Sequence, residues 1–148
     1  MEIPFFALIV AALAGIAMAL QGSLNAALGK IIGTLEATFI VHAVGIAVIL
    51  AALYLFRLGS GNIALIKAAP WYTYLGGALG VLIIFGVVLS IPRAGVANAT
   101  TAIIIGQLVT ALVIDHYGLF GLERAPFTLW KASGLALLAL GGYLMLCR

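Results

Sequence analysis

The chain has 148 residues, of which 66% are hydrophobic and only 7% are charged, and its formal net charge is +3. A soluble domain is nearer half apolar and a quarter charged, so the solvent for most of this chain must be lipid. The basic residues are scattered, which excludes a nucleic-acid partner, and the single cysteine, Cys147, excludes an intrachain disulfide and a multi-cysteine metal site.

Five apolar runs are each long enough for a helix that crosses a bilayer, which takes about 20 residues for a hydrocarbon core of roughly 30 Å. None of them alternates apolar and polar residues with a period of two, so helices are favoured over the strands of a membrane barrel. The sequence therefore predicts an all-α protein with one polytopic membrane domain over residues 1–148. Its five transmembrane helices are expected at about residues 4–29, 35–56, 71–90, 96–115 and 131–146.

Residue types at the helix ends predict where the first two helices begin. Pro4 suits the first turn of a helix, where its missing N–H is no loss, and Thr34 suits an N-cap. The connections are short: residues 30–34 join the first two helices, and residues 91–95 join the third to the fourth. None of the connections could form a soluble domain.

The orientation in the membrane depends on the Lys and Arg residues that flank the helices, since the side with an excess of them stays inside. Five spans put four basic residues on one side and three on the other, which is hardly an excess. We therefore expect insertion in both orientations; the alternative is that a subset of these charges decides and one orientation dominates. The two groups are Arg57, Lys67, Arg124 and Lys131 on one side, and Lys30, Arg93 and Arg148 on the other.

The first helix carries two amide side chains inside its apolar run. Gln21 and Asn25 are four residues apart, so they lie on one helical face. A buried amide without a partner costs a few kcal/mol in an apolar medium, so this face is expected to meet other helices or water rather than lipid. Two interpretations remain open: hydrogen bonds between helices, or the polar lining of a substrate pathway.

The second helix carries two of the candidates for coupling transport to a proton. Glu36 falls in its first turn, where a carboxylate complements the helix dipole, but an acid within a span is also a candidate for coupling. His42 lies a full turn or more deeper. It is either a neutral, hydrogen-bonded side chain or a proton relay.

The fourth helix repeats the polar pattern of the first. Thr100, Gln107 and Thr110 point broadly the same way at ~100° per residue, which makes them candidates for the same substrate pathway. Asp115 lies near that face at the end of the helix. It is either a solvated helix end or a third candidate for coupling.

Glycines recur at helical spacings, and small residues let membrane helices approach closely. We expect packing surfaces at three places: Gly15, Gly22 and Gly29 in the first helix, Gly76 and Gly80 in the third, and Gly134 and Gly141 in the fifth. The stripe on the fifth helix, with Leu138 between its two glycines, is the predicted contact between two copies of the chain.

Motifs of bond-making chemistry are missing from the sequence. We find no Walker loop, no HExxH, no Gly-x-Ser-x-Gly elbow and no cysteine cluster. The prediction is therefore a protein that is not an enzyme, with no catalytic residue, no metal site and no cofactor.

Three segments carry a family resemblance: ALQGSLNAALG in the first helix, PRAGVANATTAIIIGQL at the start of the fourth, and DHYGLFG after it. They resemble the small YdcZ-type branch of the drug/metabolite transporter superfamily, which is related to the EamA-type and small multidrug resistance transporters. The final GLALLALGG is similar to the dimerisation helix of the small multidrug resistance exporters. The resemblance implies a bacterial inner-membrane protein that pairs antiparallel with itself or with a close paralogue.

One departure from the related multidrug exporters concerns the substrate. Those exporters place a glutamate in the middle of the first helix to exchange cations for protons, whereas Gln21 and Asn25 occupy the polar stretch here. We therefore expect a secondary transporter of an unknown small polar solute, with a proton as a candidate coupling ion. It would work by alternating access as an antiparallel homodimer, with Gln107 opposite the two amides. The alternatives are a passive channel of dual topology and an accessory subunit that transports nothing.

Overall fold

The computed structural model describes residues 4–147, and within this range every regular element is a helix. Five helical segments are long and apolar enough to cross a membrane, which confirms the predicted all-α class with five spans. Pairing of two chains stays a prediction. The spans are Phe5–Ile32, Thr34–Leu55, Trp71–Ala94, Val96–Tyr117 and Leu129–Leu146.

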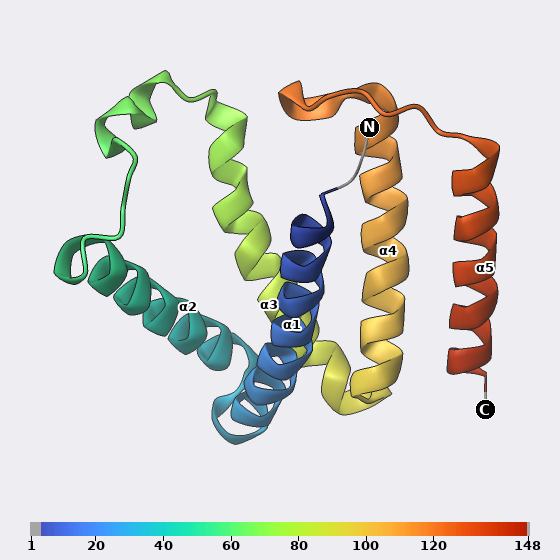
Figure 1. Ribbon diagram of the computed structural model, residues 1–148. Helices are drawn as coiled ribbons and strands as arrows, with labels where there is room; N and C mark the ends of the chain where they lie inside the picture. The colour runs from blue at the N-terminus through green and yellow to red at the C-terminus, as the bar shows by residue number, and fades with distance from the viewer. Residues whose placement is uncertain (1–3, 148) are drawn as a thin grey trace. The chain divides into compact units, whose positions relative to one another are not determined.

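The chain divides into two compact units, with the division between Arg93 and Ala94. The first unit contains helices α1 (Phe5–Ile32), α2 (Thr34–Leu50) and α3 (Leu75–Ala94). The second contains α4 (Val96–Tyr117) and α5 (Leu129–Leu146). In the second unit, α4 and α5 run side by side and antiparallel (Figure 1).

A single glycine reverses the chain between α1 and α2 (Figure 1). Gly33 has φ +103°, a conformation that costs other residues steric strain, and its N–H donates to the carbonyl of Gly29 at 3.0 Å. The five-residue connection predicted at 30–34 was therefore wrong, because α1 continues to Ile32. Thr34 is the first residue of α2 and Gly33 its N-cap, and Pro4 likewise precedes α1 as its N-cap.

A π-helical turn, Ala51–Leu55, follows α2 directly and completes the span close to its predicted end at residue 56. Two short 3₁₀ helices follow, Ile63–Ala68 and Trp71–Tyr74, before α3 begins. The side chain of Asn62 caps the first of them by accepting a hydrogen bond from the N–H of Ala64 at 2.9 Å.

Helix α3 includes Pro92 and ends at Ala94, so only Gly95 separates it from α4. The connection predicted at 91–95 was therefore wrong. A proline in the last turn removes only one helical hydrogen bond, and the guanidinium of Arg93 donates to the carbonyl of Leu89 in the same turn. Gly95, at φ +84°, is the N-cap of α4.

The segment between α4 and α5 folds back on the end of α4. Gly118 ends α4 in the left-handed conformation, and the N–H of Ala125 then donates to the carbonyl of Asp115 at 2.8 Å. Thr128 caps α5 by accepting from the N–H of Lys131, so α5 begins at Leu129, two residues before its predicted start at 131.

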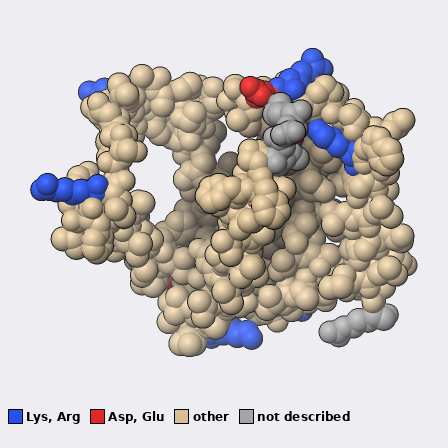
Figure 2. Space-filling view, viewed as in Figure 1, with Lys and Arg blue, Asp and Glu red and all other residues tan. Residues whose placement is uncertain are grey.

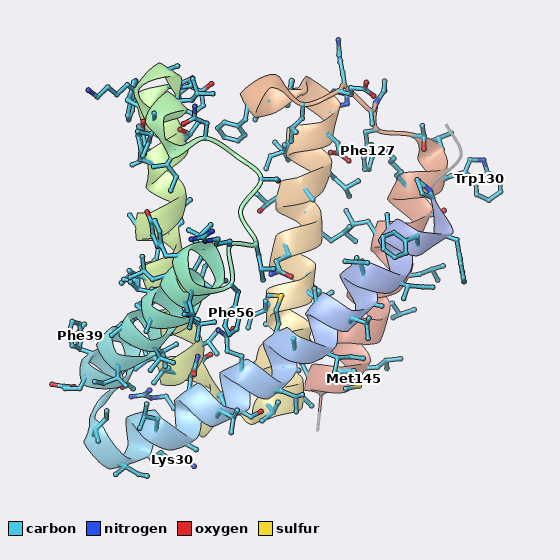
Figure 3. All side chains as sticks on the ribbon, turned by 60° about the vertical axis from the view of Figure 1, so that its left-hand side comes forward. Lys30, Phe39, Phe56, Phe127, Trp130 and Met145 are labelled. Carbon is cyan, nitrogen blue, oxygen red and sulfur yellow. The ribbon has the colours of Figure 1, made fainter. Side chains whose placement is uncertain are left out.

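Little apolar surface is buried between the helices of either unit. The large apolar side chains lie mostly exposed, as Trp130 does on the outside of α5 (Figure 3). The surface in Figure 2 is almost entirely uncharged. These faces must therefore meet lipid or another protein chain. Among the described residues, the buried apolar ones are Ala26, Ala37, Val88, Ile91 and Ala99.

Candidate functional site

In the first unit, α1 lies directly against α3 at two of its three regularly spaced glycines. A Cβ atom at Gly29 would overlap Cγ1 of Val88, and one at Gly22 would lie 3.1 Å from Ile91 of α3. Gly15 has no atom within 4 Å of its Cβ position. The close approach of the two helices is therefore confined to the C-terminal half of α1.

Asn25 lies within this contact, between the two glycines in sequence. Its side chain is only 5% exposed, and its Nδ2 atom has no hydrogen-bond partner among the described residues. An amide NH₂ group can donate two hydrogen bonds, so Asn25 is a buried donor that the structure leaves unused. The nearby hydroxyl of Ser23 is satisfied within the helix, since it donates to the carbonyl of Ala19 at 2.9 Å.

Gln21 lies in a different environment from Asn25, although the two share a helical face by their spacing. Gln21 is exposed, whereas Asn25 is enclosed. The structure thus presents one amide at the helix contact and the other on an open surface.

His42 is held by a chain of hydrogen bonds along α2. Its Nδ1 atom lies 2.8 Å from the carbonyl of Thr38, and the hydroxyl of Thr38 donates to the carbonyl of Thr34 at 2.8 Å. Sequence reasoning missed Thr38, which is 2% exposed; its signal is a Thr–His pair four residues apart, which places both side chains on one helical face.

An open groove of about 690 Å³ runs along α2 beside α3. Glu36 is at the first turn of α2, with its carboxylate against Gly33, so it lies where the helix dipole favours a negative charge. His42 also lines the groove. The lining residues are Ile32, Leu35, Glu36, Thr38, Phe39, Ile40, His42 and Val81.

In the second unit, the predicted polar face of α4 is largely open. Gln107 and Thr110 are exposed and Thr100 is half-buried. The hydroxyl of Thr110 donates to the carbonyl of Gly106 at 2.9 Å, so among these three side chains Gln107 has the most unused hydrogen-bonding capacity.

The end of α4 anchors the segment that follows it. The imidazole of His116 accepts a hydrogen bond at Nδ1 from the N–H of Phe127 at 3.1 Å. The carbonyl of His116 accepts from Nε of Arg124 at 2.8 Å. Asp115 is half-buried beside it. Within residues 4–147, no three His, Cys, Asp or Glu side chains are grouped so that they could hold a metal ion.

Residues 6–144 match the family described as "Putative inner membrane exporter, YdcZ", which covers all five spans almost completely. The chain belongs to this family. Its membership confirms the predicted resemblance and the location in the inner membrane, and the family is one of exporters rather than enzymes. No curated protein and no solved structure matches the chain.

In this member of the YdcZ family, the glycines of α5 lie on two different faces. A Cβ at Gly142 would lie 2.5 Å from Cδ1 of Ile105, so Gly142 packs against α4. Gly134 and Gly141 have open space at their Cβ positions, and Leu138 is half-buried. The stripe predicted as a dimer contact is thus free within a single chain, and its role stays a prediction.

Proposed function

We propose that this exporter is a secondary transporter that moves a small polar solute by alternating access, as an antiparallel homodimer. Membership of an exporter family supports transport in general. The observation that carries the proposal further is the Nδ2 group of Asn25, buried and without a partner. Leaving such a donor unpaired costs about 1–3 kcal/mol, which favours a solute or a water molecule as its partner during transport.

The exposed amides of Gln21 and Gln107 support a polar pathway. Both lie inside predicted spans, where a side chain that faces lipid finds no hydrogen-bond partner. A water-filled space between two protomers would satisfy both amides. Neutral amides favour a polar or weakly charged solute over a hydrophobic cation.

The homodimer is supported by the open α5 face and by the large exposed apolar surface. The near balance of basic residues favours an antiparallel arrangement. Reporter proteins fused to the C-terminus should be active on both sides of the membrane, and two or three added lysines on one side should shift that balance. A reporter active on one side only, with a parallel dimer in crosslinking, would contradict the proposal.

Gly141→Leu is expected to weaken the dimer about tenfold or more, because a leucine fills the space that close approach of two α5 helices requires. The measurement is dimer affinity in detergent or in bilayers. Gly106→Leu on α4, which also has open space at its Cβ position, serves as the control and should leave the affinity unchanged. An unchanged affinity for Gly141→Leu would place the contact on another helix.

Gln21→Cys is expected to react rapidly with a charged, water-soluble methanethiosulfonate, in a Cys147→Ser background. The reactive species is the thiolate, which forms in water but not in lipid. Leu20→Cys is the matched control. Leu20 is the neighbour of Gln21 and is 62% exposed, but its side chain is apolar. We expect it to react at least about tenfold more slowly. Equally slow labelling of Gln21→Cys and Leu20→Cys would count against a water-filled cavity.

Saturation separates the proposed transporter from a channel. An alternating-access transporter moves its solute once per conformational cycle. The flux into vesicles should therefore saturate as the solute concentration rises. A flux that stays linear and exceeds alternating-access rates by orders of magnitude would favour a pore.

A further inference from the structure

The hydrogen bond to Thr38 determines which nitrogen of His42 carries the proton. A backbone carbonyl has only lone pairs, so Nδ1, 2.8 Å from the carbonyl of Thr38, must be the donor. In the neutral imidazole, the other nitrogen, Nε2, is then an unprotonated acceptor. Thr38 is itself buried and bonded to Thr34, which holds the acceptor of this bond in place.

The free nitrogen of His42 faces α3 where that helix has no side chain. A Cβ at Gly80 would lie 3.9 Å from Nε2, so the glycine leaves the nitrogen uncovered. No hydrogen bond joins Nε2 to another described residue, and His42 is half-buried rather than sealed. The lone pair is therefore accessible from the groove between α2 and α3.

No other residue that lines the groove is as well placed to bind a proton. Of its lining residues, only Glu36 is also titratable, and its carboxylate lies against Gly33 at the N-terminus of α2. Thr38 uses its hydroxyl and its carbonyl within α2. The remaining lining side chains are apolar.

We propose that Nε2 of His42 is the proton-binding site of this transporter, an inference that rests on the proposed function and names its coupling residue. The lone pair of Nε2 forms an N–H bond with a proton that a hydronium ion in the groove gives up, which leaves water and an imidazolium; release reverses this step. A positive charge inside a span is costly without a polar partner, so uptake and release would favour different conformations. Imidazole suits this role because it changes charge between pH 5 and 8.

The test is a ¹⁵N NMR titration of the reconstituted protein labelled at histidine. The chain has only two histidines, and the structure assigns them opposite neutral tautomers, Nδ1–H for His42 and Nε2–H for His116. His116→Asn identifies the His42 signals. We expect Nδ1 of His42 to stay protonated throughout the titration, while Nε2 gains a proton as the pH is lowered.

Substitutions in α3 test whether a proton reaches Nε2 of His42 from the groove. Gly80→Leu should cover Nε2 with an apolar side chain and lower the protonated fraction at pH 5.5 about threefold or more, because desolvation disfavours the charged form. Gly80→Ala makes only an ordinary contact and should titrate like the wild type, as should Gly76→Leu, whose Cβ position is open.

The opposite tautomer for His42, or an Nε2 signal that does not change between pH 8 and pH 5, would overturn the proposal. So would a Gly80→Leu protein that titrates like the wild type. None of these outcomes bears on labelling at Gln21 or on the effect of substituting Asn25, so the solute pathway is tested separately.

Discussion

Asn25→Leu is expected to reduce export about ten- to a hundredfold while leaving the protein as stable as the wild type, or slightly more stable. Leucine has a similar volume but cannot donate hydrogen bonds to a solute, a loss of about 1.5–3 kcal/mol. The same change removes a buried donor that has no partner, so the folded chain loses no hydrogen bond of that donor. Export is measured by mass spectrometry of small metabolites released from cells that make the protein, and stability by thermal unfolding in detergent.

The experiment is decisive because export should fall while the thermal stability of the protein should not. If Asn25 only joins helices of two protomers, export and thermal stability should fall together. Ser23→Ala is the matched control two residues away, because that hydroxyl is already satisfied within α1 and should not contribute to transport. Loss of export in both variants would show that the assay reports on the helix rather than on the amide.

Gly29→Ala is expected to destabilise the first unit strongly, by about 1–3 kcal/mol. The added methyl would overlap Cγ1 of Val88, a branched and nearly fully buried side chain that cannot turn aside. Helix α3 would have to move away from α1, which would also open the contact around Asn25. Thermal unfolding and the yield of folded protein in detergent measure the effect.

Two variants separate overlap from the general effect of replacing glycine. Gly15→Ala lies in the same helix with open space around it and should be neutral or slightly stabilising. Val88→Ala introduced into the Gly29→Ala protein should restore part of the lost stability, because it removes the overlapping methyl group. Equal effects of Gly29→Ala and Gly15→Ala would mean that α1 and α3 do not approach closely there.

The sequence determined the class of this protein because a bilayer sets a simple length requirement. Within a bilayer, the backbone of five uninterrupted apolar runs can form all of its hydrogen bonds only as five helices. Each of these helices lies within a few residues of its predicted place. The errors fall at the turns. Gly33 is the only residue between α1 and α2, Gly95 is the only residue between α3 and α4, and Pro92 is accommodated in the last turn of α3, where local residue preferences had indicated loops.

Only the tertiary structure distinguished between residues that sequence spacing treats as equivalent. Gln21 and Asn25 are four residues apart on α1, yet Asn25 is buried and Gln21 is exposed. Likewise, the sequence contains two histidines near polar neighbours, but the carbonyl of Thr38 and the N–H of Phe127 assign them opposite tautomers. Periodicity specifies the direction of a side chain around its own helix. What that side chain meets depends on where a neighbouring helix crosses, and this is decided by contacts such as that between Gly29 and Val88, far apart in the sequence.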